Sequence, residues 1–207
     1  VASALSQRRG APLLVVVPTL EEAGRWTALL ELMGWNQASL YPTSEGSPYE
    51  PFDPTSEITW GQLQVLSDLL GEPNAASWAI VATERCLQPH LPPPDVLKTK
   101  TRTLRKGDEV DLEALGETLA QLGYERVTTI EQEGSWSRRG DIVDIFPVSS
   151  ELPVRLEFFG EELDKLREFD PASQRSLDPV DALRLTPTGF GPLVADQLRE
   201  LMPEGLE

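Results

Sequence analysis

Hydrophobic and polar residues follow two patterns in the first half of the chain, one typical of buried strands and one typical of amphipathic helices. The run at 11–18 (APLLVVVP) predicts a strand buried on both faces, the run at 78–83 (WAIVAT) predicts another buried strand, and ASLYP (38–42) predicts a short strand between them. Helical spacing predicts helices at 19–34 and 56–71. Strand, helix, strand, helix, strand indicates a parallel α/β layer.

Each predicted helix has an expected core face, a helix boundary and a neighbouring loop. Ser56 is the candidate N-cap of the second helix, and Gly34 and Gly71 are the expected stops. The proline-rich segment 42–57 predicts a loop, whose Tyr49 and Phe52 either hold it on the domain or bind a partner. The expected core faces are Leu20, Ala23, Trp26 or Thr27, Leu30 and Met33 in the first helix, and Ile58, Leu63, Leu66 and Leu69 or Leu70 in the second.

The pattern changes after HLPPPDVLKTK (90–100), where three consecutive prolines indicate a boundary. Asp111 as N-cap, an apolar stripe of leucines and Gly123 predict one amphipathic helix, and tight-turned strands follow to about residue 187. We therefore expect three parts. They are an α/β domain at 1–97, an α+β domain with an antiparallel sheet at 98–187, and the helical start of a further segment at 188–207.

Composition and charge narrow the classes of function. The 207 residues are 40% hydrophobic with a formal net charge of -16, which argues against broad binding of nucleic-acid phosphates. The segment 98–187 nevertheless holds 13 of the 18 lysines and arginines, so a small basic patch that faces a protein partner stays open. Because no apolar run approaches the roughly 20 residues that cross a bilayer, we expect a soluble protein without membrane contact.

Candidate catalytic and metal-binding chemistry is sparse. One cysteine, Cys86, and one histidine, His90, are too few for an internal disulfide or a Cys/His zinc site, so no metal is expected, and His90 is interpreted as a loop residue. The sequence contains no GxSxG, HExxH or GxxxxGK[ST] motif, and no pair of acids stands at a distinctive spacing. We therefore expect no catalytic residues and no enzymatic activity of the chain's own.

The stretch VRLEFFG (154–160) carries the candidate binding residues. A strand places alternate residues on opposite sides, so Arg155, Glu157 and Phe159 point away from a core face. An exposed aromatic beside arginines is typical of a binding hot spot, and Arg139 reaches the same face if the strands pair. The alternative is that Phe159 packs under a helix while the arginines form surface ion pairs with Glu157 or Asp141.

Residues 123–177 resemble a known module. The ordered pattern is GY, a glycine and an aromatic, RG, DIFP, PVRLEFF, an acidic strand and FDPASQRS. It is similar to the module shared by the bacterial transcription-repair coupling factor and the excision-repair protein UvrB. Only about sixty residues separate VVVP from WAIVAT, with no tyrosine-rich hairpin, which favours the coupling factor family. The upstream segment LYPTSEGSPYEPFDPTSEITWGQLQVL extends the resemblance to nearly the whole chain.

The resemblance implies an architecture and a role. The expected fold is a nucleotide-binding-like α/β domain that has lost its nucleotide site and therefore holds no cofactor. A smaller second domain interrupts it, as in UvrB domains 1a, 2 and 1b. The second domain would dock UvrA, the damage-recognition ATPase. The matching contact positions are Arg139, Arg155 and Phe159, whereas Trp136 and Arg138 stand at variable positions and receive no role.

The resemblance also sets the wider expectation and its alternatives. The family protein works in the bacterial cytoplasm as an ATP-dependent DNA translocase. Its motor, RNA polymerase and double-stranded DNA contacts lie in other domains. This chain would be the N-terminal recruitment module that brings UvrA to a stalled RNA polymerase. The alternatives are a fragment of a UvrB-type damage-processing ATPase, or an autoinhibitory domain that masks the UvrA site.

Overall fold

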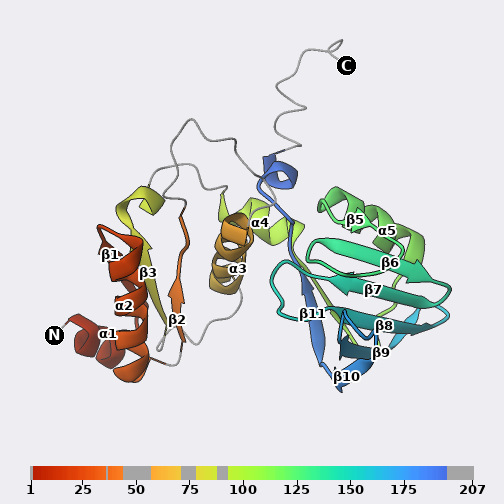
Figure 1. Cartoon of the computed structure of the whole chain (residues 1–207), viewed down its shortest axis with the longest axis horizontal. Helices are drawn as coiled ribbons and strands as arrows, with labels where there is room; N and C mark the ends of the chain where they lie inside the picture. The colour runs from red at the N-terminus through yellow and green to blue at the C-terminus, as the bar shows by residue number, and fades with distance from the viewer. Residues whose placement is uncertain (1, 36, 44–56, 71–77, 88–92, 195–207) are drawn as a thin grey trace, which may run out of the picture. The chain divides into compact units, whose positions relative to one another are not determined.

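A computed structural model of the chain describes residues 2–35, 37–43, 57–70, 78–87 and 93–194. The chain divides into two compact units, Val1–Leu91 and Pro92–Glu207, each of which is described by itself. Figure 1 draws the first unit in red to yellow and the second in green to blue. The mixed α/β character agrees with the sequence, and the finer division expected after residues 97 and 187 stays a prediction.

The first unit contains a parallel sheet. After α1 (Ala2–Arg9), the described residues form the strands β1 (Leu13–Val17), β2 (Gln37–Leu40) and β3 (Trp78–Thr83). They lie in the order β1-β3-β2, and both pairings are parallel. The predicted parallel layer is confirmed, and β3 is buried along nearly its whole length because it has a neighbour on each side.

The helices of the first unit cover opposite faces of this sheet. Side chains 79 and 81 of β3 pack against Ala23 and Leu30 of α2 (Leu20–Leu32). Side chains 80 and 82 pack against α3 (Glu57–Leu70), through Val65 and Leu66. Because alternate residues of a strand face opposite ways, α2 and α3 lie on the two sides of the sheet. Thr19 caps α2 by accepting a hydrogen bond from the Glu22 N–H.

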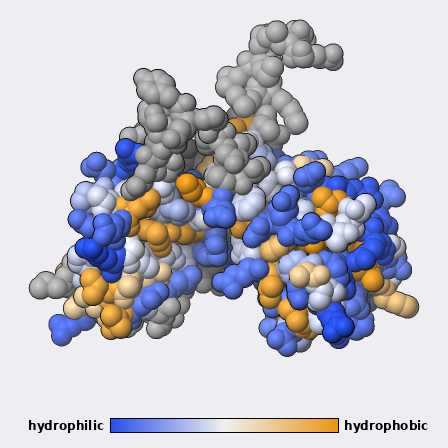
Figure 2. All heavy atoms as spheres, in the orientation of Figure 1, coloured by the Kyte–Doolittle hydropathy of each residue, from blue (hydrophilic) through white to orange (hydrophobic). Residues whose placement is uncertain are grey.

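Burial in the first unit differs from the sequence expectation at several positions. The strand β1 is not buried on both faces, since Leu14 is 54% exposed. β1 lies at the edge of the described sheet, and α2 covers only the side that carries Leu13, Val15 and Val17. Met33 of the expected α2 core face is exposed, as are Leu29 and Leu32, and Figure 2 shows hydrophobic side chains over the α1 and α2 surface. In α3 the buried stripe is Thr59, Leu63, Val65 and Ser67, whereas Leu69 is exposed.

The second unit is built on a six-stranded sheet whose order is β10-β9-β8-β7-β6-β5. Four of its five pairings are antiparallel, as predicted, but the short β5 pairs with β6 in parallel. The strands are β5 (Glu125–Arg126), β6 (Ser135–Arg139), β7 (Ile142–Phe146), β8 (Val154–Phe159), β9 (Glu162–Phe169) and β10 (Ser176–Pro179).

The larger core cluster of the second unit lies on one face of this sheet, and a smaller cluster of Ile130, Phe146 and Phe169 is separate from it. The helix α5 (Leu112–Gln121) packs in the larger cluster through Leu115 and Leu119, together with the antiparallel pair β4 (Arg102–Arg105) and β11 (Ala182–Leu185). Asp111 caps α5 by accepting hydrogen bonds from two backbone N–H groups, and Gly123 follows the helix with a φ of 90°. The predicted α5 and its boundaries are confirmed.

Two further segments add to the expected elements. A short helix, α4 (Pro94–Lys100), follows the prolines, with Pro94 in its first turn, and a 3-10 helix, η2 (Glu84–Leu87), follows β3. The expected C-terminal helix is helical at 191–194, and its remainder lies outside the described residues. Tyr49, Phe52, Ser56, Gly71 and His90 lie outside them as well.

Candidate functional site

The alternation predicted for β8 is confirmed. Val154, Leu156 and Phe158 are buried in the core beside α5. Arg155 and Phe159 point to the opposite side of the sheet, where Phe159 is 83% exposed. The alternative in which Phe159 packs under a helix is therefore wrong. We call this side the outer face and define it by Ser137, Arg139, Ile142, Asp144, Arg155, Glu157, Phe159, Lys165 and Arg167.

The strand register brings Arg139 and Arg155 together through a residue of the strand between them. In β7, Asp144 lies opposite Ser137 of β6 and opposite Arg155 of β8. Arg155 donates two hydrogen bonds to the Asp144 carboxylate, from Nε to Oδ1 at 2.7 Å and from Nη2 to Oδ2 at 3.0 Å. Arg139 Nη2 donates to the same Oδ2 at 2.7 Å. The carboxylate that pairs with both arginines is thus Asp144, not Glu157 or Asp141 as the alternative had it.

The three charged side chains differ in how much of each is exposed to solvent. The side chain of Asp144 is 1% exposed, that of Arg155 is 15% exposed, and that of Arg139 is 58% exposed. A carboxylate removed from water is stable only when its oxygens are paired and hydrogen-bonded, which the two guanidinium groups achieve here. The hydrogen bonds that Arg155 donates to the Asp144 carboxylate raise the pKa of Arg155 above its ordinary value.

Arg155 is held on its remaining sides as well. Its guanidinium carbon lies 4.8 Å from the centroid of the Phe169 ring, within the range of a cation–π contact. Its Nη1 donates to the backbone oxygen of Gln174 at 3.4 Å. Gln174 has a φ of 58°, which places it in the left-handed region. Arg155 therefore ties β7, β8 and the loop before β10 to one another.

The more exposed charges surround this cluster. Arg139 presents most of its side chain to solvent, and Arg167 is exposed at the position of β9 that pairs with Arg155. Lys165 lies 3.4 Å from the carboxylate of Glu157. The outer face thus combines an exposed aromatic side chain with exposed cations, which is chemistry suited to an acidic protein surface.

The sequence interpretation missed the role of Asp144. An available signal was the order Ile142, Asp144, Phe146, in which an acid alternates with apolar residues on one side of a strand. That pattern indicates a half-buried carboxylate in need of a cation. The partner itself depends on the register of three strands, which the sequence alone does not specify.

Trp136 and Arg138, which received no role from the sequence, face the other side of the sheet. Trp136 is buried in the α5 core and touches Gly116 of that helix, where an added Cβ would lie 3.0 Å from its ring. The Arg126 guanidinium carbon lies 5.2 Å from the centroid of the Trp136 ring. Neither residue contributes to the outer face.

Two further features of the described residues concern metal ions and membranes. Within them, no group of three or more His, Cys, Asp or Glu side chains is arranged to hold a metal ion. No helix among the described segments is long and apolar enough to cross a membrane.

Comparison with known proteins shows which family and which relatives the chain is similar to. Residues 103–189 match the family described as UvrB interaction domain. The chain is 31% identical to a transcription-repair-coupling factor of Haemophilus influenzae over 89% of its own length, and 30% identical to that of Escherichia coli over 88%. It is 34% identical to that of Mycobacterium bovis over 98%.

In each of these three comparisons the chain spans 16% of the length of the relative, so it corresponds to one region of a much longer protein. The resemblance carried by the DIFP and VRLEFF motifs is confirmed by relatives that align with most of the chain. The chain is therefore similar, over most of its length, to one region of the transcription-repair-coupling factors, and its residues 103–189 match the UvrB interaction domain.

Proposed function

We propose that this chain is a recruitment module that docks UvrA through the outer face of its second unit. The single observation that carries the proposal is the exposed Phe159, which stands at the end of β8 on the same face as Arg139 and Arg155. These are the three positions that match the family's docking residues. The family assignment and the matched UvrB interaction domain support the proposal.

Phe159 supplies the apolar anchor of the proposed contact. An aromatic side chain that is 83% exposed gains little from the fold of its own chain. Transfer of that ring into a pocket of a partner removes most of its surface from water, which is the usual origin of a binding hot spot. The anchor also requires no rearrangement, because the ring is already outside the core.

The two arginines play different parts in the proposed contact. Arg139 is more than half exposed, so its remaining N–H groups can meet carboxylates on UvrA and speed the encounter. Arg155 is mostly enclosed and gives both Nε and Nη2 to Asp144. We infer that Arg155 shapes the face and contributes charge, while Arg139 and Phe159 make the larger part of the direct contact.

The remaining functional expectations are part of the same proposal. Residues 98–187 would form the docking domain, flanked by 1–97 and by the start of a returning segment at 188–207. The full-length protein would couple UvrA to a stalled RNA polymerase and move on double-stranded DNA with a motor outside this chain, in the bacterial cytoplasm. This chain would use no cofactor and catalyse no reaction.

Charge reversal at Arg139 tests the electrostatic part of the proposal. Arg139→Glu should weaken UvrA binding by at least tenfold, mainly through a slower association rate, and should reduce the dependence of that rate on salt. The matched control is Arg126→Glu, because Arg126 stacks on Trp136 on the other side of the sheet. Surface plasmon resonance at two salt concentrations measures both rates, and equal effects of the two variants would contradict the assignment of the face.

A further inference from the structure

Two arginines lie directly opposite each other on the outer face. In the register between β8 and β9, Arg155 pairs with Arg167, and paired residues of neighbouring strands point to the same side of a sheet. Like charges at directly opposite positions are unfavourable for a sheet. A neutral or acidic residue at position 167 would therefore suit the fold better than the arginine that stands there.

One arginine of this pair is neutralised by the fold and the other is not. Arg155 is 15% exposed and donates two hydrogen bonds to the buried Asp144 carboxylate. Arg167 is exposed, and its side chain makes no ion pair or hydrogen bond with any residue in the described part of the chain. The guanidinium of Arg167 is therefore free to bind a group from outside the chain.

The neighbours of Arg167 account for its uncompensated charge. Along β9 the flanking residues on the same face are Lys165 and Phe169, and the paired residue on β10 is Pro179. None of these three, nor the arginine opposite on β8, carries a carboxylate. Glu157 also lies on the outer face, but it stands opposite Lys165, with its carboxylate 3.4 Å from the lysine Nζ.

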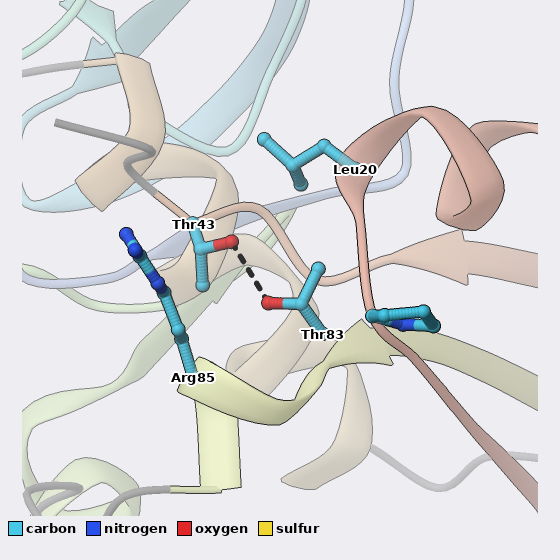
Figure 3. A pocket seen from close by; sticks show the side chains of 5 residues that line it. Leu20, Thr43, Thr83 and Arg85 are labelled. Atoms are coloured by element: carbon cyan, nitrogen blue, oxygen red, sulfur yellow. Dashed lines mark hydrogen bonds between the residues drawn. The ribbon is translucent and has the colours of Figure 1, made fainter.

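An arginine in the first unit shows the contrasting case of polar groups that are already paired. Arg85 lines a cavity of about 280 Å³ together with Thr43 and Thr83, whose hydroxyl oxygens share a hydrogen bond of 3.1 Å (Figure 3). Arg85 has an interaction partner as well. Paired groups gain little from a new contact, whereas an exposed and unpaired guanidinium such as that of Arg167 keeps its full capacity to bind.

We propose that Arg167 is a further docking residue, which binds a carboxylate of UvrA beside the contacts of Arg139 and Phe159. This inference rests on the proposed docking function and adds a fourth residue to the three matched positions. A guanidinium holds a carboxylate through two parallel hydrogen bonds. A carboxylate that arrives at Arg167 also offsets the repulsion between this arginine and Arg155.

The place of Arg167 in the sheet gives the proposed contact an orientation. Arg139 lies on β6 and Arg167 on β9, so these two exposed cations stand on opposite sides of the paired Asp144 and Arg155 in the strand order β9-β8-β7-β6. The chain as a whole carries a net charge of -16 and repels an acidic partner. Two separated cations on one face therefore favour the approach of an acidic surface in one orientation.

Arg167→Gln tests this residue, because glutamine removes the charge and keeps a polar side chain. Surface plasmon resonance of the intact chain with purified bacterial UvrA should show an affinity lower by at least about fivefold, mainly through slower association at low salt. Arg167→Lys should recover part of this loss, since lysine keeps the charge but not the paired hydrogen bonds. The matched control is Arg126→Gln, which changes an arginine on the other side of the sheet and should bind as the wild type does.

Stability separates a docking role of Arg167 from a structural one. Urea unfolding of Arg167→Gln should show a stability equal to or above that of the wild type, because one of two opposed like charges is removed. Weaker binding together with lower stability would assign Arg167 to the fold and overturn the inference. Unchanged affinity of Arg167→Gln would also overturn it, while weaker binding of Phe159→Ala in the same experiment would leave the docking function standing. Unchanged affinity in both variants would contradict the docking function as well.

Discussion

At the scale of single residues, the outer face depends on Asp144. Its buried carboxylate accepts hydrogen bonds from Arg139 and Arg155 and thereby fixes the positions of both guanidinium groups. This arrangement changes how substitutions at the candidate site are interpreted. A variant that removes Arg155 also leaves Asp144 with one fewer cation in a place from which water is excluded, so lost binding could follow from lost stability.

Arg155→Ala should therefore lower the free energy of unfolding by about 2–3 kcal/mol, because the buried Asp144 carboxylate keeps only Arg139 as a partner and its Oδ1 loses the hydrogen bond from Arg155. Urea denaturation followed by circular dichroism measures this difference. Arg167→Ala is the matched control, since Arg167 is an exposed arginine at the paired position of β9, and its effect should stay within about 0.5 kcal/mol. Equal stabilities of the two variants would contradict the structural role of Arg155.

The sequence was sufficient to predict the direction of these side chains but not their partners. The alternation of residues along β8 correctly predicted that Phe159 points outward. It also correctly predicted that Val154, Leu156 and Phe158 point into the core. Because successive side chains of a strand point to opposite faces, this prediction needs only the sequence of the strand itself. The pairing of Arg155 with Asp144 depends on the register between β7 and β8, which is a property of the folded sheet.

At the scale of elements, the sequence predicts an amphipathic helix well when the helix packs on a single layer with one apolar face. The strongly patterned α5 has the predicted cap and buried leucines. The edge strand β1 was mispredicted because a continuous apolar run cannot reveal whether a second helix covers its other face. The short β5, β4 and β10 carry too few residues to show a period of two, so the parallel pairing of β5 was missed.

A matched pair of glycine substitutions tests the packing of two helices. Gly24→Ala in α2 should raise the free energy of unfolding by up to about 1 kcal/mol, because no neighbouring atom lies within 4 Å of the added Cβ. Gly116→Ala in α5 should lower it, because the added Cβ would meet the buried Trp136 ring at 3.0 Å. Urea unfolding measures both, and a gain in stability for Gly116→Ala would contradict the close contact between α5 and β6.

At the scale of the whole molecule, the chain holds two units with separate cores. Leu30 is fully buried between α2 and the parallel sheet, and Leu156 is fully buried between α5 and the antiparallel sheet. The sequence prediction placed a boundary after residue 97, in the segment that follows the prolines, and that division stays a prediction. The proposed docking surface lies in the second unit alone.

Separate cores predict separate unfolding transitions. Trp26, Trp35, Trp60 and Trp78 lie in the first unit, so tryptophan fluorescence mainly reports that unit, whereas circular dichroism reports both. Leu30→Ala should move the fluorescence transition to lower urea, and Leu156→Ala should move only a second transition seen by circular dichroism. Each should cost about 2–5 kcal/mol in its own unit. If the fluorescence and circular dichroism transitions shift equally in both variants, the chain unfolds as one cooperative structure instead.

The most direct test of the docking proposal is calorimetric binding of this chain to purified bacterial UvrA, with Phe159→Ala and Leu32→Ala beside the wild type. Both side chains are large, apolar and more than four-fifths exposed, at 83% and 85%, so neither change should alter the melting temperature appreciably. We predict that Phe159→Ala lowers affinity about 30-fold or more, while Leu32→Ala binds as the wild type does. Unchanged affinity in Phe159→Ala, or no binding by the wild type, would contradict the account.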